Sequence, residues 1–150
     1  MQQAYGFYQR ELFHKLDVRS AFIEFDAHGT FVGGAYGYMT PRDWARLGLF
    51  YLDRGKWHGE QVLSPEWVDF AFTPSPAANF YGAQLWINTG GNDWPQLPEN
   101  IYHFSGHQGQ EILMMPDRDL VVVRTGITEA DADVGVVEFM QGILAAIPHT

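Results

Sequence analysis

The 150-residue sequence contains no cysteine. This excludes disulfide bridges, zinc–thiolate sites, iron–sulfur clusters and a thiol nucleophile. Positive charge is also scarce, because nine lysines and arginines stand against eighteen aspartates and glutamates, and the formal net charge is −9. Such a charge repels the phosphate backbone of nucleic acids and anionic membrane surfaces, so we expect neither as a partner.

Long apolar runs are missing as well, and none approaches the roughly 20 residues that a membrane-spanning helix needs. What the sequence does have is 46% hydrophobic and 15% aromatic residues, with 18% charged residues. This composition is typical of a folded globular chain, and the length falls in the range of one domain. We therefore expect a single domain over residues 1–150, with its own hydrophobic core and no bound metal or organic cofactor.

Helical and extended patterns follow one another in an order typical of an α+β fold. Apolar residues of helical period predict a helix over residues 4–16, and Thr40-Pro41 predicts the start of a helix ending at Leu52. Gly48 in the apolar face of that helix indicates close packing. Ser64-Pro65 repeats the starting signature. Extended patterns predict strands at 81–87, 101–104, 111–115 and 120–124, followed by a helix at 130–147. We expect an antiparallel sheet with flanking helices.

The segment from residue 102 to 126 is the strongest candidate for chemistry. Its first strand ends in the cluster Ser105-Gly106-His107-Gln108-Gly109. Glycines there would let an acyl substrate lie against the strand, with backbone amides facing a developing oxyanion and His107 acting as a proton carrier or hydrogen-bond donor. This would be half of an acyl-transfer site. The alternative is a glycine-rich β-bend that carries an exposed histidine.

Other candidate constellations are weaker. His103 and His107 have the spacing of a helical metal pair, but an extended segment would separate them by about 13 Å. Asp131 and Asp133 match the first two ligand positions of a calcium loop, yet the later ligands are missing, and the pair fits better at the positive end of a helix. Ser105 is the one serine in a glycine-flanked setting beside a histidine, although a turn-forming hydroxyl is the favoured explanation for it.

Two stretches resemble a known superfamily. The first runs from Gly37 through Val68, and the second combines Tyr81 to Trp86 with Gly106-His107-Gln108-Gly109-Gln110 and the segment 116–126. Their order and spacing resemble the serine β-lactamase and penicillin-binding-protein superfamily. Within it, the resemblance is to the class C-like branch of esterases, D-stereospecific peptidases and 6-aminohexanoate-dimer hydrolases, and it spans residues 4–147.

The resemblance implies a fold and a set of roles. The chain would be the carboxy-terminal part of a β-lactamase-like fold, and the second stretch would match the strand that bears the family's Lys-Thr-Gly or His-x-Gly motif. By this match, His107 would support catalysis at the wall of the acyl pocket. The neighbouring Gly106, Gln108, Gly109 and Gln110 would contact the substrate, which in this family is a small amide or ester.

The sequence departs from the family at the nucleophile. The family attacks with the serine of Ser-x-x-Lys, whose lysine eases deprotonation of the hydroxyl, and assists it with Tyr-x-Asn. No serine of this chain has a lysine three residues later, and no tyrosine has an asparagine two residues later. We therefore expect the chain to be the carboxy-terminal fragment of a longer hydrolase and to be inactive alone, with the missing amino-terminal half as its partner.

Two alternatives stay open. The chain could be a non-catalytic interaction module that kept the sheet and lost the chemistry. Because the family pairs an amino-terminal strand with the one matching residues 120–125, that edge would be open here, and we expect copies of the chain to associate through it. The other alternative is an autonomous enzyme that uses Ser105 and His107.

Overall fold

The computed structural model describes residues 2–129 and 135–147, and its centre is a four-stranded antiparallel sheet. The strands are β5 (Trp86–Ile87), β6 (Tyr102–Gly106), β7 (Gln110–Met115) and β8 (Leu120–Arg124), hydrogen-bonded in that order. Ser105 pairs with Glu111 across β6 and β7, and Glu111 pairs in turn with Arg124 of β8. The expected meander is therefore confirmed, and each strand lies beside the next one in the sequence.

The predicted starts of two helices are confirmed by their hydrogen bonds. α2 (Pro41–Leu52) begins at Thr40, whose hydroxyl accepts from the Asp43 amide at 3.4 Å. α3 (Pro65–Phe72) begins at Ser64, whose hydroxyl accepts from the Trp67 amide at 3.3 Å. In both helices proline occupies the first turn, where its missing N–H leaves no bond unmade.

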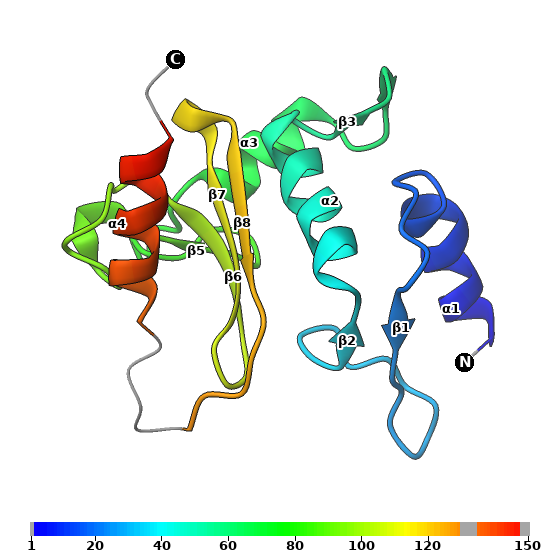
Figure 1. Cartoon of the computed structure of the whole chain (residues 1–150). Helices are drawn as coiled ribbons and strands as arrows, with labels where there is room; N and C mark the ends of the chain where they lie inside the picture. The colour runs from blue at the N-terminus through cyan, green and yellow to red at the C-terminus, as the bar shows by residue number, and fades with distance from the viewer. Residues whose placement is uncertain (1, 130–134, 148–150) are drawn as a thin grey trace.

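The sheet lies between two helices (Figure 1). α4 (Val136–Ala146) covers one face through a cluster that contains Leu113, Met115, Val122, Val136 and Met140. α2 crosses the opposite face, where a Cβ atom on Gly48 would lie 2.6 Å from Val121 and 3.4 Å from Ile112. Side chains alternate between the faces of a strand, so successive residues of β7 and β8 face α4 and α2 alternately.

The segment 2–40 packs on the side of α2 that faces away from the sheet (Figure 1). They form α1 (Gln2–Tyr8), a π-helical turn at Gln9–Phe13, and the short paired strands β1 (Phe22–Ile23) and β2 (Gly37–Tyr38). Their apolar cluster contains Phe13, Leu16, Val18, Ala21, Ile23 and Phe50. A further hairpin, β3 (Lys56–Trp57) and β4 (Glu60–Gln61), follows α2.

Asp43 joins this first segment to α2. Its side chain is 4% exposed and accepts hydrogen bonds from the Ser20 hydroxyl at 2.6 Å and from the backbone amides of Arg19 and Ser20 at 3.0 and 2.9 Å. The Arg46 guanidinium donates to its other oxygen. Burial by itself raises the pKa of Asp43, but these hydrogen bonds outweigh it and hold the pKa below its ordinary value of 3.8.

Two expected elements differ from the structure. The helix predicted at 4–16 is α-helical only at Gln2–Tyr8 and continues as the π-helical turn at Gln9–Phe13. The strand predicted at 81–87 is regular only at Trp86–Ile87, because the chain before it makes a tight bend in which Gln84 has a φ of 67°. A Cβ atom on Gly82 would lie 2.0 Å from the Ala71 carbonyl oxygen, so this bend packs directly against α3. The last helix is described over Val136–Ala146, and the expectation for residues 130–134, with Asp131 and Asp133, lies outside the described residues.

No helix among the described residues is long and apolar enough to cross a membrane.

Candidate functional site

The candidate motif forms the tip of the hairpin between β6 and β7. His107, Gln108 and Gly109 make the turn, with φ values of 60° at Gln108 and 79° at Gly109. A Cβ atom on Gly106 would lie 3.0 Å from the Gln110 Cβ. The two glycines therefore allow the strands to reverse at this point, as expected for a glycine-rich bend.

The segment after β8 braces this hairpin tip. The Gln110 side chain accepts from the Gly126 amide at 3.1 Å and donates to the Gly126 carbonyl. The Thr128 amide donates to the Gln108 carbonyl at 3.1 Å, and the Arg124 guanidinium donates to the Gly109 carbonyl. The tip is thus held on one side by protein, and both polar ends of the Gln110 side chain already have partners.

His107 extends from the tip into solvent. Its side chain is exposed, and in the described part of the chain no hydrogen bond, ion pair or ring contact reaches it. The Ser105 hydroxyl donates to Glu111 at 2.8 Å instead of pairing with His107. The two residues proposed for an autonomous enzyme are therefore near in sequence but engaged in different surroundings. His107 remains available to a substrate or to another polypeptide.

His103 occupies the buried end of the same strand. Its Nδ1 lies 3.2 Å from Glu111 Oε2, and its Nε2 lies 3.1 Å from Asp93 Oδ2. His103 is 3% exposed and Glu111 is 6% exposed, while 28% of the Asp93 side chain is exposed. With Ser105 bonded to the second oxygen of Glu111, four polar side chains form one continuous series.

This series lines a pocket of about 290 Å³. Its other walls are aromatic, since the ring centroids of Trp94 and Trp86 lie 4.4 and 6.4 Å from that of His103. His103 is buried and lines this pocket, whereas His107 is exposed and does not line it, which removes the geometric basis for a metal pair. The sequence reasoning did not single out Asp93, Glu111 or His103 as a group.

A signal for part of this group was present in the sequence. Alternation along β6 places His103 and Ser105 on one face, and the hairpin register places Glu111 directly opposite Ser105. Asp93 comes from the loop between β5 and β6, and no periodicity relates a loop residue to a strand. Its approach to His103 could be found only from the folded chain.

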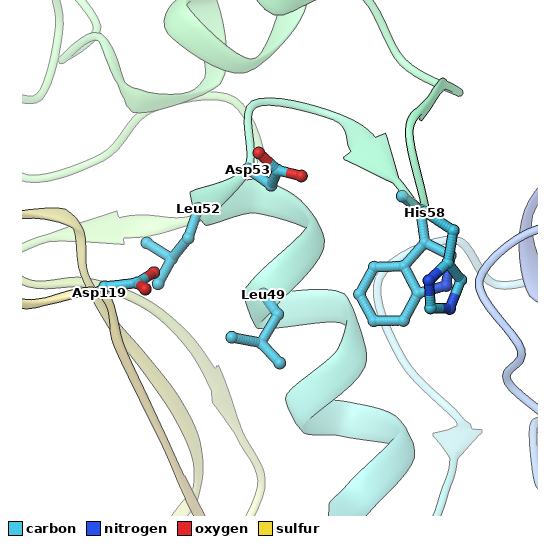
Figure 2. Close-up of a pocket in the computed structure, with 6 residues that line it drawn as sticks. Leu49, Leu52, Asp53, His58 and Asp119 are labelled. Carbon is cyan, nitrogen blue, oxygen red and sulfur yellow. The ribbon is translucent and has the colours of Figure 1, made fainter.

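A second hollow, of about 350 Å³, lies at the end of α2. Figure 2 shows Leu49, Leu52 and Asp53 on the last turns of this helix, with Asp119 to one side and His58 to the other. His58 pairs with Asp17, Nε2 to Oδ2, at 3.2 Å. Among the described residues, no serine, threonine or lysine lines this hollow, and its titratable side chains are those of Asp53, His58 and Asp119.

No protein-family model and no curated protein matches the sequence. Solved structures do match the fold. A Bacillus anthracis protein described as a 6-aminohexanoate-dimer hydrolase aligns with 93% of this chain at a TM-score of 0.71 and 20% identity. A Bacteroides dorei protein described as a β-lactamase aligns with 94% of it at a TM-score of 0.66 and 13% identity. The chain spans 36% and 51% of the lengths of those two proteins, and its α+β fold is β-lactamase-like.

Proposed function

We propose that this β-lactamase-like chain forms the carboxy-terminal wall of an acyl-transfer cleft. The longer parent protein would cleave a small amide or ester through a seryl acyl-enzyme. Its nucleophile and activating lysine would lie in a preceding portion of the polypeptide. The chain of 150 residues would bind at most part of a substrate and would be inactive alone.

One observation carries this proposal. Almost the whole chain superimposes on only 36% of the Bacillus anthracis protein, while its own sequence contains neither Ser-x-x-Lys nor Tyr-x-Asn. A fold of this kind without its nucleophile is most simply one part of a larger catalytic unit. The braced hairpin tip supports the proposal, because it presents His107 at the surface on a backbone held by hydrogen bonds.

Within the cleft, we assign His107 a supporting role beside the reacting carbonyl. Gly106, Gln108, Gly109 and Gln110 would form the surface along which the substrate lies. The hydrogen bonds from Gln110 to Gly126 favour contact through the backbone of the tip over contact through this side chain. Preorganised backbone donors are the usual means of stabilising a developing oxyanion.

Exposed aromatic side chains are consistent with a further portion of the protein. Trp67 and Phe70 of α3 are 48% and 59% exposed, with ring centroids 5.5 Å apart. Phe22 and Tyr38 of the β1–β2 pair are similarly exposed and lie 6.1 Å apart. Apolar patches of this kind commonly mark surfaces that another polypeptide covers.

The test begins with the coding sequence immediately upstream. We expect Ser-x-x-Lys and Tyr-x-Asn there, and a longer product that hydrolyses nitrocefin or p-nitrophenyl esters. The 150-residue chain should hydrolyse neither, and His107→Ala in the longer product should slow acylation. Turnover by the 150-residue chain, or an upstream sequence without these motifs, would contradict the proposal.

The second candidate is a non-catalytic module that associates through its sheet. β8 pairs only with β7 among the described strands, so its outer side is an edge. An unpaired edge is a template for another strand. Two observations together would favour this candidate: an upstream sequence without catalytic motifs, and defined oligomers of the chain in solution.

A further inference from the structure

The buried contacts of His103 determine how many protons the site must hold. An ionised carboxylate offers only acceptor oxygens, so a ring nitrogen that faces one must carry a proton to make a hydrogen bond. His103 has such a contact at each nitrogen, with Glu111 at 3.2 Å and Asp93 at 3.1 Å. With both carboxylates ionised, the ring holds two protons and a positive charge.

Among the described residues, no other cation pairs with these two carboxylates. Within residues 2–129 and 135–147, their only ion-pair partner is His103. Arg124 stands opposite Glu111 across β7 and β8, but its guanidinium donates to the Gly109 carbonyl and to the Thr128 hydroxyl at 2.9 Å. A neutral imidazole would leave one buried nitrogen lone pair directed at a carboxylate, which is repulsive.

We propose that His103 is a positioning residue, doubly protonated, that clamps the loop between β5 and β6 to the β6–β7 hairpin and fixes the Ser105 hydroxyl through Glu111. Glu111 uses one oxygen for His103 and the other for Ser105. Because the two oxygens belong to one rigid carboxylate, holding the first sets the position of the second. Ser105 directly precedes the hairpin tip, so the clamp acts beside the proposed cleft.

The loop has two anchors of different chemistry. Asn88 is fully buried, and its side-chain amide donates to the carbonyls of Trp94 and Pro98 at 3.0 Å, while its carbonyl accepts from the Trp94 amide at 2.9 Å. This neutral anchor ties the loop to itself. His103 supplies the anchor that ties the loop to the sheet, and Trp94 packs on the ring at 4.4 Å.

The proton count can be measured directly on the 150-residue chain. In a sample labelled with ¹⁵N at histidine, the signals of His103 are those lost in His103→Gln. We expect both ring nitrogens of His103 to carry a proton while Glu111 and Asp93 are ionised. In Glu111→Gln the new amide can donate to Nδ1, so we expect a single ring proton, at Nε2. A single ring proton in the unchanged chain would overturn the proposal.

The positioning role is tested through the loop. Asp93→Ala removes the acceptor, whereas Asp93→Asn keeps a hydrogen-bonding group without its charge. We expect hydrogen exchange at the Trp94 amide to become about tenfold faster in Asp93→Ala and to stay within about twofold of the original in Asp93→Asn. Glu99→Ala, which removes an exposed charge from the same loop, should leave it unchanged.

Equal exchange in Asp93→Ala and the original chain would show that His103 does not position the loop. Equally fast exchange in Asp93→Asn and Asp93→Ala would show that no hydrogen bond carries the effect, which also overturns the proposal. The clamp is a property of the described residues themselves. It would therefore persist if the parent protein proved not to be an acyl-transfer enzyme.

Discussion

Among single residues, Asp43 shows how hydrogen bonds can outweigh burial. Its carboxylate is almost fully buried at the start of α2, where it meets donors from Arg19, Ser20 and Arg46. Its pKa in the folded chain lies below 3.8 because these donors favour the charged form more than burial opposes it. The charged form is therefore a feature of the native state.

The lowered pKa sets a direction for acid unfolding. Below pH 3.8 the unfolded chain takes up a proton at this position before the folded chain does, so stability falls as pH drops toward the folded pKa. Above pH 3.8 the contribution is fully present. Asp43→Asn should lower the free energy of unfolding by about 2 to 3 kcal/mol at neutral pH. It should also make the free energy of unfolding fall less steeply as the pH is lowered. Urea unfolding between pH 3 and 7 measures both effects.

Asp53→Asn provides the matched control for that prediction. Asp53 is exposed at the end of α2, so its replacement should not change how the free energy of unfolding falls with decreasing pH. If Asp43→Asn and the original chain lost stability in parallel as pH falls, Asp43 would not be the source of the acid sensitivity.

Single residues also mark the limit of what the sequence could predict about the site. The tip Gly106–Gln110 was predictable because glycine and its neighbours have local conformational preferences. The exposure of His107 and the pairing of Ser105 with Glu111 depend on strand register. The contact between Asp93 and His103 depends on the path of a loop, and no local pattern encodes it.

At the scale of elements, the packing of α2 on the sheet depends on one missing side chain. Gly48→Leu would direct a side chain into Val121, whose nearest methyl group lies 2.6 Å from the position of a Cβ atom. We expect it to lower the free energy of unfolding by about 3 kcal/mol through overpacking. Urea titration would measure the loss.

Gly142→Leu is the matched change on the other side of the sheet. Gly142 is exposed in α4, and no atom lies within 4 Å of where its Cβ would be. Leucine favours a helix over glycine, so this variant should gain about 0.5 to 1 kcal/mol. A lower free energy of unfolding in Gly48→Leu together with a higher one in Gly142→Leu would support the described packing. A lower free energy of unfolding in both variants would contradict it.

Helix starts were the elements best predicted from sequence. A hydroxyl followed by proline acts within one turn, so Thr40 and Ser64 could be recognised without any tertiary information. The strand predicted at 81–87 failed for the opposite reason. The close approach of Gly82 to Ala71 bends the chain there, and this contact joins two elements whose relation the periodicity does not contain.

On the scale of the whole molecule, β8 is the edge of the sheet among the described strands. If the chain is the non-catalytic module, we predict that it self-associates through this edge. Thr125→Lys, next to β8, should shift the equilibrium toward monomer, because a charge on an edge disfavours strand pairing. Gln141→Lys adds the same charge on an exposed position of α4 and controls for the change in net charge. Light scattering that gives only monomer over a wide concentration range would contradict this prediction.

The order of the elements was enough to predict the fold class. The fold alone does not tell whether all the catalytic residues are present in this chain. The strands 101–124 pair in sequence order, so the meander could be read from the sequence. The position of the nucleophile had to be inferred from residues that the sequence lacks. The central claim is therefore chemical: we propose that this chain is a wall of an acylation site and contains no reactive serine.

Intact-mass analysis after treatment with a fluorophosphonate tests that claim most directly. The probe forms a stable adduct with an activated serine and leaves ordinary hydroxyls unmodified. We predict that the purified 150-residue chain keeps its original mass, as does its Ser105→Ala variant. A stoichiometric adduct on the original chain that disappears in Ser105→Ala would contradict the account and identify Ser105 as a nucleophile.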